Sequence, residues 1–180
     1  FTETEALRVL AAAEGRRNAA RWSVGLAIGL RQGEALGLRW PYVDLDAGEM
    51  RVWWQLHRRA FEHGCAPAGV RPTCGRRRAG NCPDKTLRLR TGEERVEGGL
   101  ILKEPKGSGK ATIPIPKELV DELRRHREVQ DLEKSMAGPV YQDRGFVFAD
   151  PDVYFLGYFR NNCDGDINSC SQFGYHLTMF

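Results

Sequence analysis

The spacing of apolar positions changes several times along the chain, and each change predicts a different element. Residues 3–14 (ETEALRVLAAAE) favour helix, and Thr2 followed by Glu5 fits a capping box at its start. Asn18 is a candidate cap for a second helix at residues 19–30 (AARWSVGLAIGL), which is apolar on nearly every side. Its glycines, four residues apart, indicate a close neighbour. We therefore expect this second helix to be the central helix of the core.

The following stretch changes from helical to extended character. Residues 33–40 (GEALGLRW) predict a brief helix that is stopped by Pro41, and residues 44–49 (DLDAGE) have the composition of a turn. Residues 50–56 (MRVWWQL) then alternate between apolar and polar or exposed positions. This period of two predicts one half-buried strand.

The second half of the chain supplies two more strands and a long helix. Residues 99–105 (GLILKEP) and 110–116 (KATIPIP) fit two strands joined by the turn KGSG as a hairpin, with Pro114 at an edge or at the strand end. Residues 116–134 predict a helix with an apolar stripe, and residues 145–150 (GFVFAD) predict a short buried extended run. We expect an α+β fold, mainly helical, with one small three-stranded antiparallel sheet.

Length and composition exclude several classes of protein. The 180 residues, 41% of them hydrophobic, are sufficient for one domain with its own core. No apolar run approaches the roughly 18 residues that cross a bilayer, and the start FTETEALRVL has no signal-peptide pattern. We expect a cytoplasmic protein without membrane association. Because the sequence opens at Phe1 inside a helix start, we also expect it to be part of a longer chain.

The positive charge is concentrated in one region. The net charge is only +3, but residues 51–90 contain ten Lys or Arg against Glu62 and Asp84, a local net charge of +8. Such an excess is typical of surfaces that bind a polyanion. The alternative is a solvated arginine-rich loop without a partner.

Residues 57–98 form a basic insertion between the first two predicted strands. Besides His57, it contains four residues of the types that bind zinc, namely His63, Cys65, Cys74 and Cys82. A glycine-rich loop without a core of its own is where a structural zinc would help. However, no Cys-x-x-Cys pair is present, which favours free thiols in a reducing cytosol. The sequence therefore predicts no metal and no cofactor, and zinc remains the alternative.

Several cations in and near the insertion are candidates for contacts with the phosphates of a polyanion such as DNA, which give affinity without sequence choice. They are Arg58, Arg59, Arg76, Arg77, Arg78 and Lys110.

Arg31 follows the second predicted helix directly. There we expect packed backbone to hold its guanidinium rigidly, so that the planar fork of donors could grip two oxygens of a phosphate. The alternative is an arginine that caps helix carbonyls or pairs with Glu34.

The stretch GLRQGEALGLRWPYVDLD (residues 29–46) closely resembles the first signature of the tyrosine recombinases, the phage-integrase family. In this signature a Gly-Leu-Arg triplet precedes a Glu and then a Leu-Arg-Trp that leads into an acidic turn. The resemblance continues in LKEPKGSGKATIPIPKELVDELRRHR (residues 102–127), similar to the family's hairpin lysine and next helix. It covers about residues 1–150.

The resemblance implies strand exchange in double-stranded DNA. A tyrosine attacks a backbone phosphate and forms a covalent 3′-phosphotyrosyl link, which the 5′-hydroxyl of a partner strand then reverses, without metal or cofactor. Arg31 matches the arginine that clamps the scissile phosphate, and Lys106 matches the lysine that protonates the departing 5′-oxygen, with Lys110 as the competing candidate. Glu34 would support Arg31. Self-association on DNA is implied for the full-length protein.

The sequence departs from the family pattern near its end. A His-x-x-Arg box and a nucleophilic tyrosine should follow residues 145–150, but His176 is followed three positions later by Met179. No motif surrounds the tyrosines of this part, which are Tyr154, Tyr158 and Tyr175. We therefore interpret residues 1–152 as a partial catalytic domain and residues 153–180 as an aberrant tail, from a truncation or a shifted reading frame.

Three functions remain open. The first is site-specific recombination or integration, by a fragment that is inactive alone. The second is a non-catalytic DNA-binding module on the same scaffold. The third is a zinc-stabilised protein-interaction domain.

Overall fold

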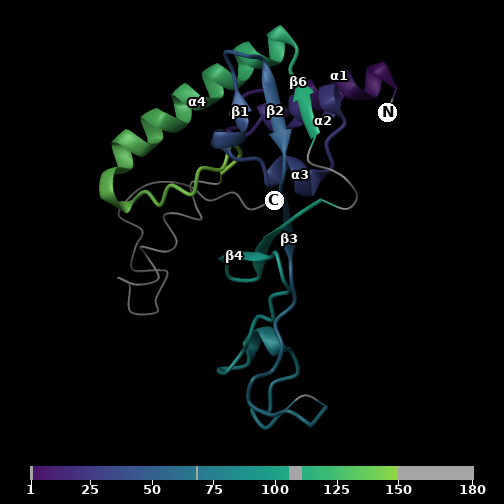
Figure 1. Ribbon diagram of the computed structural model, residues 1–180, viewed down its shortest axis with the longest axis vertical. Coiled ribbons are helices and arrows are strands. Elements are labelled where there is room, and N and C mark those ends of the chain that lie inside the picture. Colours follow the sequence, from purple (N-terminus) through teal and green to yellow (C-terminus); the bar gives the residue numbers. More distant parts are fainter. Residues whose placement is uncertain (1, 68, 106–110, 150–180) are drawn as a thin grey trace.

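The computed structural model describes residues 2–67, 69–105 and 111–149. Within these ranges the chain forms four α-helices and two three-stranded antiparallel sheets (Figure 1). The predicted α+β class is confirmed. The prediction of a single sheet is wrong, because the strands divide into two groups.

The elements have the following bounds. The helices are α1 (Glu3–Ala13), α2 (Ala20–Ile28), α3 (Gln32–Leu36) and α4 (Lys117–Ala137). The first sheet has the order β1-β2-β6, formed by Val43–Asp44, Glu49–Val52 and Ala111–Pro114. The second has the order β3-β5-β4, formed by Gln55–Arg58, Leu100–Lys103 and Glu94–Glu97. Short 3-10 turns occupy Trp40–Tyr42, Ala79–Asn81 and Gly138–Val140.

The single strand predicted at residues 50–56 is in fact two strands in different sheets. Met50 and Val52 of β2 are 0% and 5% exposed, as the alternation predicts, and Met50 belongs to the main core. After β2 the chain leaves the first sheet, and β3 begins in the second. Trp54 and Leu56 continue the apolar alternation but pack against a second, smaller cluster. The pattern therefore predicts the burial in β2 correctly, but residues 53–56 are all half-buried, and the pattern does not reveal the change of pairing partner.

The predicted hairpin between residues 99–105 and 110–116 is also wrong. β5 pairs with β3 and β4, whereas β6 pairs with β2. Because β2 and β3 are consecutive, β5 and β6 pair with two successive parts of one extended segment. β6 lies at the edge of its sheet and ends at Pro114, as expected for a residue that cannot donate to a ladder.

The N-terminal helix confirms one capping prediction, and the second helix contradicts another. The Thr2–Glu5 capping box is present at the start of α1. The N-cap of α2 is Ala19, without a side-chain hydrogen bond, so Asn18 does not cap this helix. The Asn18 amide instead donates to the Ala149 carbonyl oxygen (3.2 Å) and ties the α1–α2 connection to residues far along the chain.

The main core lies between α2, α4 and the first sheet. Val24, Met50, Leu123 and Val147 are its completely buried members. Burying each such side chain stabilises the fold by about 1.5–3 kcal/mol before conformational entropy is counted. α4 supplies the apolar stripe that its sequence predicts.

α2 is less central than predicted. Of its residues only Ala20 and Val24 are buried, and Trp22 is 43% exposed. Gly29 makes no close helix contact and instead ends the helix in the left-handed conformation with φ 72°. α3 likewise ends earlier than predicted, at Leu36, and Pro41 lies inside the following 3-10 turn.

Residues 146–149 of the run predicted at 145–150 are buried as expected, but only Phe146 forms a β-bridge, with Arg39, and the chain bends at Val147 and Phe148. Residues 145–149 lie along the segment that follows α3, where Trp40 N donates to Gly145 O (2.8 Å) and Val147 N donates to Leu38 O (3.0 Å). The C-terminal end of the described chain therefore pairs with the signature region of residues 29–46.

Two buried polar side chains of α4 complete this contact. Gln130 accepts a hydrogen bond from Trp40 Nε1 (2.5 Å) and donates to Phe146 O (3.1 Å). The carbonyl oxygen of Val147 accepts a hydrogen bond from His126 Nε2 (2.7 Å). Because both side chains are at least 92% buried, their hydrogen bonds are needed to offset desolvation.

Residues 57–98, called the arm below, extend away from the helices and the first sheet (Figure 1). At its base Arg59 N donates to Gly99 O (2.7 Å), and farther out Glu62 and Thr86 exchange two backbone hydrogen bonds (2.9 and 3.0 Å). Within the described part of the arm, Cys82 is the only buried residue. The arm therefore has almost no hydrophobic core of its own.

In the part of the chain that the structure describes, no helix is both long and apolar enough for a bilayer crossing.

Candidate nucleic-acid interface

Arg31 lies in the short connection between α2 and α3. Gly29 reverses the chain after α2, and Arg31 has extended backbone angles (φ −65°, ψ 150°) as the N-cap of α3. Its carbonyl oxygen accepts the first hydrogen bonds of α3, from the backbone N–H groups of Glu34 and Ala35 (2.9 and 3.0 Å). The backbone of Arg31 is therefore fixed by a helix start.

The side chain of Glu34 contacts both the backbone and the side chain of Arg31. One carboxylate oxygen accepts from Arg31 N (3.0 Å), and the other lies 3.4 Å from a guanidinium nitrogen of Arg31. The Glu34 side chain is 13% exposed, whereas that of Arg31 is 77% exposed. The expectation that packed backbone holds the guanidinium is therefore wrong. The fold fixes the backbone of Arg31 and leaves most of its side chain open to solvent.

Two glycines let a strand pass directly over α3. A Cβ at Gly37 would lie 2.7–2.8 Å from three backbone atoms of residues 54–56, and one at Gly33 would lie 2.9 Å from Leu56 O. Such distances exclude a side chain unless the backbone moves. The start of β3 therefore lies against the helix that Arg31 begins.

The strands on either side of the loop that carries Lys106 pair with neighbouring positions of the chain. Before the loop, Lys103 pairs with Gln55, and the Gln55 side chain donates to Glu104 O (2.9 Å). After the loop, Ala111 pairs with Val52. Both ends are therefore anchored at the junction of β2 and β3, beside α3. Lys106 and Lys110 themselves lie outside the described residues, as do the tyrosines and His176 of residues 153–180.

The candidate backbone-binding arginines differ in their surroundings. Arg58 and the run from Arg76 to Arg78 are exposed. Arg59 forms an ion pair with Glu93, and their side chains are 20% and 6% exposed. The pairing arises because β3, which precedes Arg59, and β4, which follows Glu93, both pair with β5. Arg59 is therefore committed to the arm itself, which argues against the predicted contact with DNA.

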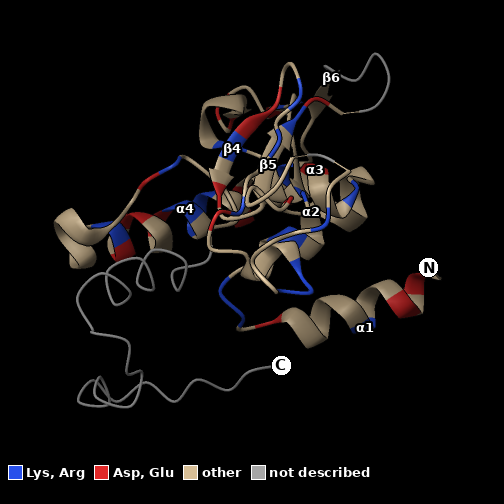
Figure 2. Ribbon diagram, turned by 90° about the horizontal axis from the view of Figure 1, so that it is seen from below, with Lys and Arg blue, Asp and Glu red and all other residues tan. Residues whose placement is uncertain are grey.

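The helices and the first sheet, called the body below, carry both acidic and basic residues (Figure 2). α4 carries acidic and basic residues along its length. A groove of about 470 Å³ between α4 and the first sheet is lined by three arginines and by the carboxylates of Asp44, Asp46, Glu49, Glu128 and Asp131. An excess of carboxylates does not suit a phosphate backbone. The groove is therefore not part of the candidate interface.

Sequence reasoning missed the residues that connect the arm to the body. Arg39 donates to Glu94 of β4 (3.0 Å), and its guanidinium lies 5.1 Å from the ring centre of Phe146. Arg144 donates to the Val96 carbonyl oxygen and pairs with Glu97. The only signal in the sequence was the Leu-Arg-Trp triplet at residues 38–40. It contains Arg39 but does not indicate which residue Arg39 contacts.

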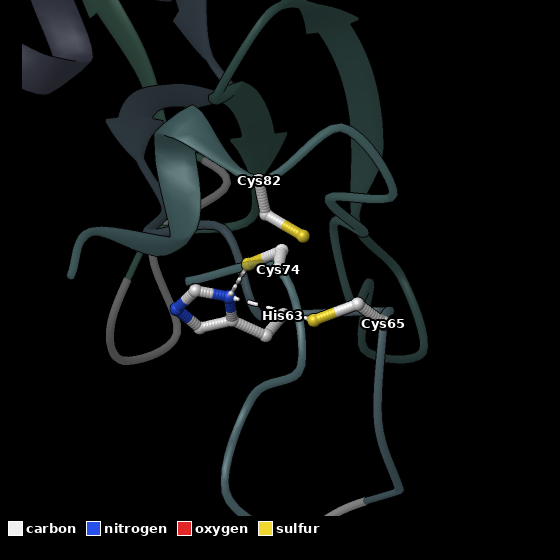
Figure 3. Close-up of side chains that lie close together, drawn as sticks. All are labelled: His63, Cys65, Cys74 and Cys82. Atoms are coloured by element: carbon white, nitrogen blue, oxygen red, sulfur yellow. Dashed lines mark hydrogen bonds between the residues drawn. The ribbon is translucent and has the colours of Figure 1, made fainter. Parts of the chain in front are cut away.

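The four zinc-type residues of the arm lie together (Figure 3). His63 Nδ1 is 3.4 Å from Cys74 Sγ and 3.9 Å from Cys65 Sγ. Hydrogen bonds to the Cys65 sulfur, of which that from the backbone of Cys74 has the largest effect, lower the pKa of the Cys65 thiol to about 6. His57, which belongs to β3, is not part of this cluster.

Comparison with known proteins gives two informative relatives, although no family model matches the chain. An integrase of Saccharopolyspora erythraea is 30% identical over 163 residues, which cover 80% of this chain and 37% of that protein. A tyrosine recombinase XerC-like protein of Caldanaerobacter subterraneus subsp. tengcongensis is 29% identical over 151 residues, which cover 82% of this chain and 32% of that protein. The chain thus spans about a third of the length of these curated relatives. With the Gly-Leu-Arg signature at Arg31, these similarities support the assignment of the chain to the tyrosine recombinase, or integrase, family.

Proposed function

We propose that the chain takes part in site-specific DNA recombination by strand exchange, and that it binds duplex DNA and grips the scissile phosphate through Arg31. The observation that carries this proposal is the contrast between a fixed backbone and a 77% exposed guanidinium at Arg31. An exposed guanidinium can reach a ligand as large as duplex DNA, and its fork of donors matches two phosphate oxygens.

The proposed role of Arg31 is to stabilise negative charge on the reacting phosphorus group. Attack on a phosphodiester concentrates charge on the non-bridging oxygens, and a preorganised cation lowers the energy of that transition state. Glu34 is the positioning residue in this proposal, because its carboxylate holds Arg31 N (3.0 Å). Its weaker contact with the guanidinium, at 3.4 Å, leaves the remaining donors for phosphate.

Lys106 is the proposed general acid for the departing 5′-oxygen, with Lys110 as the competing candidate. The anchoring of both loop ends beside α3 supports this role, because the loop then starts and ends near the element that Arg31 begins. A lysine that gives a proton to an alkoxide as it forms removes the need for a free strongly basic leaving group.

A second candidate, a non-catalytic DNA-binding module, is favoured by one feature of the sequence. No His-x-x-Arg pattern occurs anywhere in the 180 residues, and His176 is followed by Met179 at the required position. In this version the chain binds DNA and forms no covalent link. When catalytic residues act as a unit, the loss of one of them removes nearly all of the enzyme's activity. DNA binding can therefore persist where the chemical reaction does not occur.

A nicked duplex that traps the covalent intermediate distinguishes the two candidates. The strand-exchange proposal predicts a protein–DNA adduct that survives denaturing electrophoresis and that Arg31→Ala abolishes. Binding without any adduct supports the second candidate.

A matched control separates phosphate gripping from loss of charge. Arg8 is an exposed arginine of α1, so Arg8→Ala removes the same charge. We expect Arg31→Ala to weaken duplex binding and to reduce the salt slope by about one unit, whereas Arg8→Ala leaves the slope unchanged. Equal effects of both substitutions would contradict a specific role for Arg31.

A further inference from the structure

The arm brings together the side chains of three cysteines and one histidine that are up to 19 positions apart in the sequence. The ligand atoms of His63, Cys65, Cys74 and Cys82 all lie within 4.8 Å of one another (Figure 3). A tetrahedral zinc ion, with Zn–S bonds of about 2.3 Å and Zn–N bonds of about 2.0–2.1 Å, holds its ligand atoms roughly 3.5–3.8 Å apart. The two histidine–sulfur distances of 3.4 and 3.9 Å are already close to this spacing.

Contacts that involve no sulfur atom bring the ligands together. Glu62 and Thr86 pair through two backbone hydrogen bonds, which align the segment of His63 and Cys65 with the segment of Cys82. Gly64, between two of the ligands, lies directly against the Asp84 carbonyl oxygen, where a Cβ would not fit. The Thr73 hydroxyl donates to Cys65 O (2.8 Å) and brings the neighbouring Cys74 to the same point.

The surroundings explain why an ion would be needed. Cys82 is 2% exposed, yet it is the only buried residue in the described part of the arm. Because no apolar core surrounds this thiol, hydrophobic packing does not account for its burial. Small units that cannot build a core are commonly held together by a metal or by disulfides.

We propose that His63, Cys65, Cys74 and Cys82 bind one zinc ion in a tetrahedral Cys₃His site that holds the arm in its folded form. His63 binds through Nδ1, the ring nitrogen that faces the sulfurs. All four positions are filled by protein, which makes the site structural, since a catalytic zinc keeps a position open for water. This proposal depends on the arm alone and does not require strand exchange.

A disulfide is the competing explanation for the clustered thiols. Three cysteines can form only one such bond and would leave one thiol and the histidine without a role. Three thiolates and one imidazole, by contrast, match the ligand number and the ligand types that zinc selects.

The site would also order part of the proposed DNA-binding surface. The run from Arg76 to Arg78 lies between Cys74 and Cys82, so the ion would fix both ends of this basic segment. This consequence, unlike the site itself, rests on the proposed function.

Metal content of the whole chain is the primary test. Protein purified under reducing conditions and dialysed after exposure to ZnCl₂ should retain one zinc per chain by elemental analysis. Replacement by Co²⁺ should give visible bands of a tetrahedral ion and a thiolate-to-cobalt charge-transfer band. Absence of bound zinc and of these bands would overturn the proposal. So would a disulfide among these cysteines, detected by mass spectrometry, in protein purified with zinc.

Variants distinguish ligands from bystanders. Cys74→Ser should weaken Co²⁺ binding by more than about 100-fold, beyond what loss of a supporting partner costs. His63→Cys should retain the ion with a stronger charge-transfer band, which keeps the test valid if Cys74→Ser is unstable. His57→Gln and Cys163→Ser, the latter outside the described residues, should leave Co²⁺ binding unchanged. Retention of full affinity by Cys74→Ser would disprove the ligand assignment.

Tryptic cleavage supplies a readout of folding in the same chain. Chelation of the ion should accelerate cleavage at Arg76, Arg77 and Arg78 at least tenfold, while fragments from α4 appear at an unchanged rate. Cleavage of the arm that is indifferent to chelation would show that a bound ion does not hold it. Neither result depends on whether the protein forms an adduct with DNA.

Discussion

Among the glycines near Arg31, Gly37 has the tightest surroundings. A Cβ there would lie within 2.8 Å of three backbone atoms where β3 begins. Gly25 is the opposite case, because it lies inside α2 and a Cβ at this position would have no neighbour within 4 Å outside the helix's own backbone.

We therefore predict opposite effects for the same substitution at these two glycines. Gly37→Ala should lower the free energy of unfolding by about 1–3 kcal/mol, since the backbone of β3 must shift. Gly25→Ala should raise it by about 0.5–1 kcal/mol, because alanine favours the helix interior. Urea denaturation of both variants measures the difference. Equal stability of the two variants would contradict the close approach of β3 to α3.

His126 makes the stability of the fold depend on pH. Burial lowers the pKa of His126 below its ordinary value of 6.5, although the hydrogen bond to Val147 O opposes the shift. Below pH 6.5 the unfolded chain therefore binds a proton that the folded chain resists. The stability contributed by neutral His126 is complete above that pH and is lost as the pH falls towards the folded pKa.

We predict that the free energy of unfolding decreases between about pH 7.5 and about pH 5, and that His126→Gln makes this decrease smaller. Denaturant titrations of both proteins at several pH values provide the comparison. Arg17 and Glu133, the charged groups that face His126, are kept in both proteins. An identical pH dependence of the two proteins would show that His126 is not responsible.

At the scale of elements, α4 supports the candidate interface through buried hydrogen bonds. Gln130 links this helix to Trp40, just after α3, and to the buried run at Phe146. α4 therefore holds the backbone that follows the Arg31 signature, although it is not part of the exposed surface around that arginine.

Gln130→Leu tests this connection. It leaves the Trp40 N–H and the Phe146 carbonyl without their partner in a buried place, so we predict a loss of about 1–3 kcal/mol in the free energy of unfolding. Val129, on the same helix, is 52% exposed. Val129→Ala should change stability by less than about 0.5 kcal/mol in the same thermal or urea denaturation. A loss for Gln130→Leu no larger than for Val129→Ala would contradict the role of Gln130.

The strands show which kind of information a sequence pattern carries. The alternation at residues 50–56 predicted the burial of Met50 and Val52. It could not reveal that β2 and β3 pair with different strands, because alternation records which face is buried and not the identity of the neighbour. The false hairpin of β5 and β6 has the same cause.

At the scale of the whole molecule, charge and packing are separated. The helices and the first sheet contain most of the core, whereas the arm has a net charge of +5, from ten Lys or Arg against five carboxylates, and only Cys82 is buried in its described part. On the proposed function, the arm adds affinity through phosphate contacts without affecting the core.

Replacement of Arg76, Arg77 and Arg78 by alanine tests this separation. We predict that the slope of log K against log salt becomes less negative by up to about 2.7, or 0.9 for each lost phosphate contact, with unchanged stability of the body. Replacement of Lys117, Arg124 and Arg125 of α4 removes the same charge elsewhere. Fluorescence anisotropy with a labelled duplex measures both slopes. Equal changes would indicate a diffuse field in place of a specific surface.

The sequence by itself determined the local features of this protein. It predicted the capping box of α1, the long amphipathic α4, the buried run near residue 147 and the signature that contains Arg31 and Glu34. Each of these depends on residues a few positions apart, whose chemistry is visible in the chain. The exposure of the Arg31 guanidinium was not visible, because it depends on what else packs around it.

Only the tertiary structure decided which distant segments meet. It placed both ends of the Lys106 loop beside α3, paired Arg59 with Glu93, and brought His63, Cys65, Cys74 and Cys82 to one point. The absence of a Cys-x-x-Cys pair argues against zinc when the sequence is considered alone. The convergence of the four ligands is produced by the backbone pairing of Glu62 with Thr86, a contact between residues 24 positions apart that no local pattern encodes.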